Sequence, residues 1–93
     1  MRKMFKFHKK GWILLEVEVD KLTGRSWKIV GFGEKRKHQV IFEDVHSANM
    51  YDKEGKFVEG LRPESVSKYV RVDASVPRRA KYITREQAML EVM

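Results

Sequence analysis

The residues with the clearest chemical potential in this sequence are basic, and they gather in three short segments. The stretch FGEKRKHQVIFED, residues 32–44, places Lys35, Arg36, Lys37 and His38 in a row. A second segment, RKMFKFHKK, opens the chain, and a third, PRRAKY, covers residues 77–82. Ammonium and guanidinium groups bind phosphate and release its counterions, so the chemistry that these segments predict is polyanion binding.

The distribution of charge supports this interpretation more strongly than the net value of +7. Residues 1–10 carry five basic and no acidic side chains, and residues 25–38 carry five basic and one acidic. Residues 39–64 reverse the sign, with three basic and six acidic side chains. Clustered positive charge is typical of proteins that bind nucleic acid. The alternative is a solvated surface that keeps a small protein in solution.

The basic run at residues 35–38 is expected at the tip of a hairpin between two strands. Hairpin turns usually need Gly, Asn or Asp, and neighbouring like charges repel each other. A bound phosphate backbone would convert that repulsion into attraction. The alternative is that the charges keep the strand edge from aggregating.

The arm and the N-terminal segment combine basic with aromatic side chains. Arginine binds phosphate through two nitrogens and also stacks on bases, and Tyr82 adds an aromatic neighbour. Alternation in the N-terminal segment places Phe5 and Phe7 beside lysines, as single-strand binders require. The alternatives are solvated linker arginines and phenylalanines that belong to the core. The predicted nucleic-acid contacts are Lys3, Lys6, Lys9, Lys10, Lys35, Arg36, Lys37, His38, Arg78, Arg79, Lys81 and Tyr82.

Catalysis and metal binding find less support. The three histidines, at positions 8, 38 and 46, lack the spacing of a helical metal site, and there is no cysteine. His38 and His46 would stand about 26 Å apart on an extended strand. A metal-free nuclease could still combine His8 or His46 with Glu43 and a lysine. The expectation is no catalytic residue, no metal and no cofactor, with a nuclease as the third hypothesis.

The elements that must position these residues are mostly strands. In WILLEVEV, residues 12–19, successive side chains alternate between two faces of a strand. One face is apolar throughout, and the other is apolar at its start and charged at its end. DKLTG then predicts a turn with Gly24 at positive φ. Thr84 and Gln87 have the spacing of a capping box that starts a short C-terminal helix, with Ile83 packing on Ala88. The further strands expected are residues 4–8, 25–32, 38–45 and the short YVRV, with a second tight turn at 53–56 and a helical turn at Pro63.

Short strands with regular turn signals predict a small barrel or a strongly bent sheet, in which Gly31 and Gly33 mark a bend or bulge. The pattern SWKIVGFGEKRKHQVIFEDV followed by LRPESVSKYVRV resembles SH3-like barrels of the Tudor and KOW type over residues 25–72. The expected fold is mainly β, with about five short strands and a C-terminal helix in a single domain. Its parts are a basic N-terminal segment at 1–10, the barrel at 11–72, a basic arm at 73–83 and the helix at 84–93.

The acidic centre of the chain suggests a second surface. MYDKEGKFVEG mixes aromatic and acidic side chains, which favours head-to-tail self-association as a homodimer or a basic protein partner. The alternative is an ordinary solvated hairpin. The predicted protein contacts are Tyr51, Asp52, Glu54, Phe57 and Glu59.

The sequence therefore predicts a small, non-enzymatic protein that binds nucleic acid with little sequence preference, RNA ahead of DNA. The alternative is an inhibitor or regulator that binds an acidic protein, alone or together with RNA; size and basicity resemble the accessory proteins that phages make against host factors. The longest apolar run, WILL, is too short to span a bilayer, so no membrane partner is expected. Together with the lack of cysteine, this predicts a cytoplasmic protein.

Overall fold

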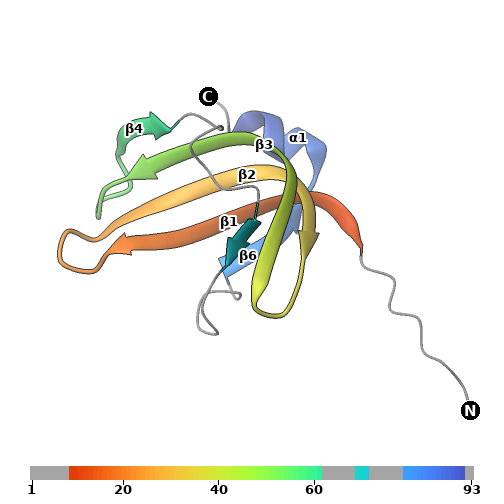
Figure 1. Ribbon diagram of the computed structural model, residues 1–93. Coiled ribbons are helices and arrows are strands. Elements are labelled where there is room, and N and C mark those ends of the chain that lie inside the picture. The colour runs from red at the N-terminus through yellow and green to blue at the C-terminus, as the bar shows by residue number, and fades with distance from the viewer. Residues whose placement is uncertain (1–8, 62–68, 72–78, 92–93) are drawn as a thin grey trace, which may run out of the picture.

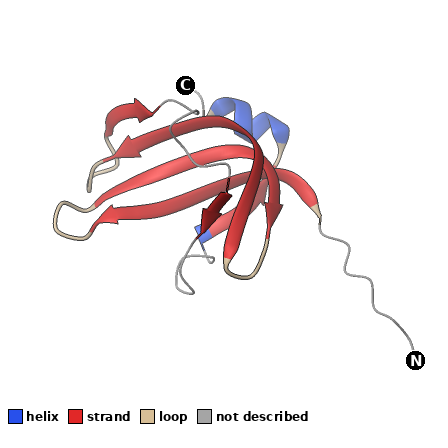
Figure 2. Ribbon diagram, viewed as in Figure 1, coloured by secondary structure: helices blue, strands red, loops and turns tan. Residues whose placement is uncertain are grey.

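The computed structural model describes residues 9–61, 69–71 and 79–91. These residues form one antiparallel sheet with a short helix at its C-terminal end (Figures 1 and 2). The strands are β1 (Lys10–Asp20), β2 (Arg25–Lys35), β3 (Gln39–Tyr51), β4 (Phe57–Leu61), β5 (Tyr69–Arg71) and β6 (Ala80–Ile83), and the helix is α1 (Arg85–Leu90). The predicted class, mainly β with a C-terminal helix, is confirmed.

The sheet has the order β4-β3-β2-β1-β6, and β5 adds to β3. Since β4 and β6 lie at opposite ends of this order, the described strands make a bent, open sheet instead of a closed barrel. The strands β1, β2 and β3 have 11, 11 and 13 residues, so all three are longer than the sequence predicted. In the described part of the chain, no helix has the length and hydropathy needed to cross a membrane.

The first hairpin forms where the sequence predicts it. The Asp20 side chain accepts a hydrogen bond from the Leu22 N–H at 2.8 Å, and the Gly24 N–H donates to the Asp20 carbonyl at 2.9 Å. Gly24 has a φ of 71°, a conformation that glycine adopts at no steric cost. The predicted turn at 53–56 is likewise present, with two backbone N–H groups donating to the Asp52 side chain.

Two bulges bend β3 opposite the glycines of β2. The β2–β3 register passes over His46 and then over Glu43, so that neither has a partner on β2. A side chain on Gly33 would lie 2.8 Å from the Phe42 Cα and closer still to the Ile41 carbonyl oxygen. The two backbones therefore approach closely only because the residue is glycine, and the predicted bulge is confirmed.

The bend lets β3 use one edge twice. Residues 48–51 pair with β4 and residues 39–41 pair with β5, while β2 occupies the opposite edge along most of the strand. Figure 1 shows β3 arching across the molecule between these two partners. The sequence predicted the short YVRV strand, and β5 confirms it, but the double use of β3 was not foreseen.

The sheet is buried on both faces near the middle of β1. On the concave face Ile13 and Leu15 join a fully buried cluster that includes Phe42 and Ala80. On the convex face Leu14 and Val30 pack under Ala88 of α1, with Ile83 beside them. Both predicted faces of β1 are thus confirmed. The convex face ends in charged residues beyond the helix, where Glu16 is half-buried and Glu18 is exposed.

The helix begins at the predicted capping box. The Thr84 side chain accepts a hydrogen bond from the Gln87 backbone N–H at 3.1 Å, and the Gln87 side chain accepts one from the Thr84 N–H at 3.0 Å. Immediately before it, the last four residues of the predicted arm at 73–83 form β6, paired with β1. The expected strand at 4–8 and the helical turn at Pro63 lie outside the described residues.

Candidate nucleic-acid interface

Three basic segments that are far apart in the sequence meet at one tyrosine. The Tyr82 hydroxyl donates a hydrogen bond to the Lys9 carbonyl oxygen at 2.5 Å and accepts one from the Lys35 N–H at 3.1 Å. These bonds span 73 and 47 residues of chain. They fix the end of the N-terminal segment, the arm and the base of the β2–β3 hairpin against one another.

Strand register explains why Tyr82 reaches this point. Tyr82 pairs with Ile13 in the β1–β6 ladder, so its side chain lies on the concave face of the sheet. Gly11, two residues earlier on β1, leaves room for the ring, because a Cβ there would lie 3.3 Å from the Tyr82 Cδ1. The Lys9 ammonium covers the ring at 5.2 Å from its centroid. Since neighbours occupy its ring and hydroxyl, Tyr82 is better suited to positioning cations than to stacking on a base.

The β2–β3 hairpin accommodates its basic tip without glycine. The Arg36 N–H donates to the Gln39 carbonyl at 2.8 Å, and Arg36, Lys37 and His38 all avoid positive φ. The Arg36 Nε also donates to the Glu34 carboxylate at 2.8 Å. A negative-φ turn closed in this way can carry any side chain, so its sequence is open to selection for charge.

We define the basic rim as Lys9, Lys10, Lys35, Arg36 and Lys37. Two carboxylates accompany these five cations: Glu34 pairs with Arg36, and Glu43 pairs with Lys10 at 3.1 Å. Within the described residues no ion pair involves the other three lysines. The rim therefore carries an excess of about three positive charges next to the hydrogen-bonded Tyr82 hydroxyl. In the Lys10–Glu43 pair both side chains are about half-exposed, so this pair contributes little to stability and can exchange for a phosphate. In the other pair Arg36 is 43% exposed, but Glu34 is only 12% exposed.

Comparisons with protein-family models, curated proteins and solved structures give no match for this chain. The resemblance of residues 25–72 to SH3-like modules stays a prediction.

The other predicted nucleic-acid contacts are distributed unevenly. His38 lies exposed at the hairpin tip beside the rim, and Arg79 lies exposed just before β6. Lys81 pairs with Leu14 and so projects from the convex face, away from Tyr82. Lys3, Lys6 and Arg78 lie outside the described residues.

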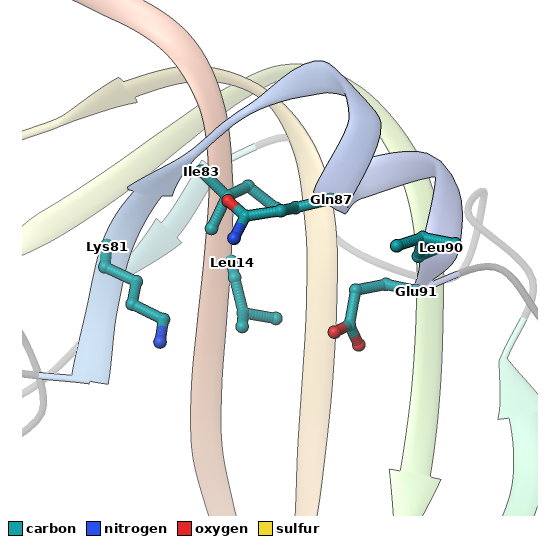
Figure 3. A pocket seen from close by; sticks show the side chains of 6 residues that line it. All are labelled: Leu14, Lys81, Ile83, Gln87, Leu90 and Glu91. Atoms are coloured by element: carbon teal, nitrogen blue, oxygen red, sulfur yellow. The ribbon is translucent and has the colours of Figure 1, made fainter.

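Lys81 instead borders a shallow groove between β6 and the helix. Figure 3 shows the Lys81 ammonium, the Gln87 amide and the Glu91 carboxylate around Leu14. The groove has a volume of about 270 Å³ and is also lined by Ile83 and Leu90. Opposite charges stand on its two sides, so it lacks the uniform sign that a polyanion requires.

The predicted protein-contact residues surround the β3–β4 turn, at the other end of the sheet from the basic tip of the β2–β3 hairpin (Figure 1). Tyr51 meets Phe57 edge to face, with ring centroids 6.2 Å apart, and Lys28 covers the Tyr51 ring at 4.9 Å. Asp52 is used by the turn itself, because the N–H groups of Glu54 and Lys56 donate to its carboxylate. Glu54 and Glu59 are exposed, and they supply the negative charge of this end.

An aromatic cluster on the convex face was not singled out from the sequence. Trp12 and Phe32 are opposite each other on β1 and β2, with ring centroids 5.7 Å apart and an interplanar angle of 78°. His46 meets Trp12 at the same separation, with an angle of 77°. Alternation on β1 placed Trp12 on this face, but its partners depend on the hairpin register and the bulge at His46.

His46 also bears on the hypothesis of a metal site or nuclease. Its Nε2 is buried and has no hydrogen-bond partner within the described structure. His38 precedes β3 and is exposed, whereas His46 lies inside β3 instead of at its end. Across residues 9–61, 69–71 and 79–91, no three His, Asp or Glu side chains gather as metal ligands would.

Proposed function

We propose that this protein binds nucleic acid without sequence preference, RNA ahead of DNA, through phosphate contacts of the basic rim. The observation that supports this most directly is that the Tyr82 hydroxyl accepts a hydrogen bond from the Lys35 N–H and donates one to the Lys9 carbonyl. These bonds bring basic segments from three parts of the chain to one place. Segments whose backbones are already held together lose less conformational entropy on binding than separate, unconnected segments.

In this proposal the lysines without ion pairs make the first phosphate contacts. Lys37, exposed at the hairpin tip, and Lys9, above the Tyr82 ring, both reach solvent from fixed backbone positions. Arg36 can exchange the Glu34 carboxylate for a phosphate with the same fork of donors. Backbone contacts of this kind carry no sequence information, so the binding is sequence-tolerant.

RNA is favoured because the described chain has no helix suited to reading the DNA major groove. The only helix in the described residues, α1, has six residues, and its one buried residue, Ala88, packs against the sheet. The arginine-rich arm is typical of segments that bind RNA.

Salt dependence tests the proposal. If five cations contact single-stranded phosphates, the slope of log K against log salt should be about −3.5. Fluorescence anisotropy with two unrelated RNA oligonucleotides measures the slope and the lack of sequence preference together. A slope near zero, or a large difference between the two sequences, would overturn the proposal.

The second candidate is an inhibitor or regulator that binds another protein. The observation in its favour is apolar exposure at the end of the sheet opposite the rim, where Phe57 is 61% and Leu22 97% exposed. An acidic polypeptide such as polyglutamate, matched in charge to the RNA, tests whether the rim distinguishes nucleic acid from an acidic protein. Equal affinity for both polyanions, at equal ionic strength, would show that the rim responds to negative charge alone and would remove the preference for nucleic acid.

A further inference from the structure

On the convex face of the β1–β2 hairpin, three successive cross-strand pairs become more exposed and more polar toward the basic rim. The cross-strand pair Leu14–Val30 is 7% and 1% exposed, because α1 covers it. The next pair, Trp12–Phe32, is only half-buried. The last is Lys10–Glu34, at the rim itself. A half-buried aromatic pair therefore lies between the buried core and the charged rim.

Two aromatic contacts hold the indole of Trp12 in place. Phe32 on β2 and His46 on β3 both meet it at a ring-centroid separation of 5.7 Å and at nearly perpendicular angles. His46 reaches it because the bulge releases that residue from the β2–β3 register. An aromatic side chain fixed in this way stacks on a ligand with little further loss of rotamer freedom.

The spacing between the aromatic pair and the nearest rim cation suits a nucleotide. Trp12 and Lys10 are alternate residues of one strand and therefore share a face, about 7 Å apart along it. A nucleotide whose phosphate contacts Lys10 can thus bring its base over the aromatic pair. Every base has a π-face, so such stacking is as tolerant of sequence as the phosphate contacts.

We propose that Trp12 and Phe32 form a stacking platform for unpaired bases, which makes single-stranded nucleic acid the preferred ligand of the basic rim. This rests on the proposed function, since the rim supplies the phosphate contacts. Bases inside a duplex are already stacked on each other and cannot reach the platform without unpairing. The rim alone would bind both forms, so the aromatic pair is what discriminates between them.

The two tryptophans of the chain allow a direct test. Trp27→Phe leaves Trp12 as the only indole, whereas Trp12→Phe leaves Trp27, which packs against the concave core, as the matched control. Each variant is titrated with a single strand of about 12 nucleotides and with a duplex of the same sequence, while anisotropy follows binding. The single strand should quench Trp12 but not Trp27, and the duplex should quench neither.

Substitution of Phe32 supplies a second measurement. Phe32→Leu removes the ring but keeps apolar bulk, and it should weaken single-strand binding roughly tenfold while leaving duplex binding unchanged. Phe32→Tyr keeps the ring and should restore the affinity. Thermal unfolding of both variants checks that the fold survives.

The outcomes separate this inference from the function on which it rests. Binding without Trp12 quenching, together with full affinity in Phe32→Leu, would overturn the platform and leave phosphate binding intact. Equal quenching by duplex and single strand would overturn the selectivity. No binding of either form by the unmodified chain would overturn the proposed function itself.

Discussion

The Tyr82 hydroxyl accepts a hydrogen bond from the Lys35 backbone N–H at 3.1 Å, although 47 residues separate the two in the chain. The same hydroxyl donates to the Lys9 carbonyl, so one oxygen links β6, the base of the β2–β3 hairpin and the start of β1. The basic rim is therefore a product of tertiary structure, and its geometry depends on a residue that contributes no charge.

Tyr82→Phe should weaken RNA binding without changing its salt slope. The variant keeps the ring against Gly11 but loses both hydrogen bonds, so the five cations remain while their arrangement loosens. Loss of the two bonds should cost about 1–2 kcal/mol, a fall in Tm of roughly 4–16 °C. Calorimetry and anisotropy measure the two effects. Tyr51→Phe, at the far end of the sheet, is the control and should leave binding unchanged.

Local signals predicted much of the fold. Alternation in residues 12–19 identified both faces of β1, because successive side chains in a strand point to opposite sides. The turn at Gly24 and the capping box at Thr84 depend on backbone chemistry within a few residues, and both are confirmed. Each of these features is specified by neighbours in the chain and needs no knowledge of the rest of the molecule.

The features that were not predicted depend on long-range register. Nothing near Tyr82 in the sequence indicates Lys35 as a partner, because their contact needs β6 to pair with β1 and β1 with β2. The pairing of Arg36 with Glu34 is local, two residues apart, but it depends on the shape of a turn that lacks positive φ, which the sequence did not predict. The basic residues of the candidate site were therefore predictable as a set, whereas their arrangement was not.

Gly33→Ala should destabilise the sheet by at least about 2 kcal/mol, because the added Cβ meets the backbone of β3, which cannot move without disturbing the bulge. Gly60→Ala is a matched control on β4, where the nearest atom is the end of the Asn49 side chain at 3.1 Å. Urea unfolding compares the two variants. A cost for Gly33→Ala no greater than that for Gly60→Ala would contradict the interpretation of this glycine as a close-approach residue.

Thr84→Ala should destabilise the protein by about 1 kcal/mol, because the first turn of α1 loses its cap. Thr84→Ser keeps the hydroxyl and should behave like the unmodified chain. Since Ala88 of α1 seals Leu14 and Val30, amide hydrogen exchange should accelerate in α1 and then in the middle of β1 and β2. Faster exchange confined to the helix would show that the convex core does not depend on the cap.

Glu34→Gln provides a test in which binding should improve. The Glu34 side chain, only 12% exposed, neutralises Arg36, and glutamine can still accept the Arg36 hydrogen bond while removing the negative charge. Arg36 would then reach phosphate without competition from a carboxylate, so affinity for RNA should rise. The salt slope should stay near the roughly −3.5 expected for five contacts, because Arg36 is already one of them. Glu59→Gln makes the same change in net charge on β4, beyond the roughly 10 Å over which charges act at 0.1 M salt. It should leave both quantities nearly unchanged. Anisotropy titrations over a series of salt concentrations measure affinity and slope for both variants. Equal gains in the two variants would mean that overall net charge, and not the basic rim, attracts the nucleic acid.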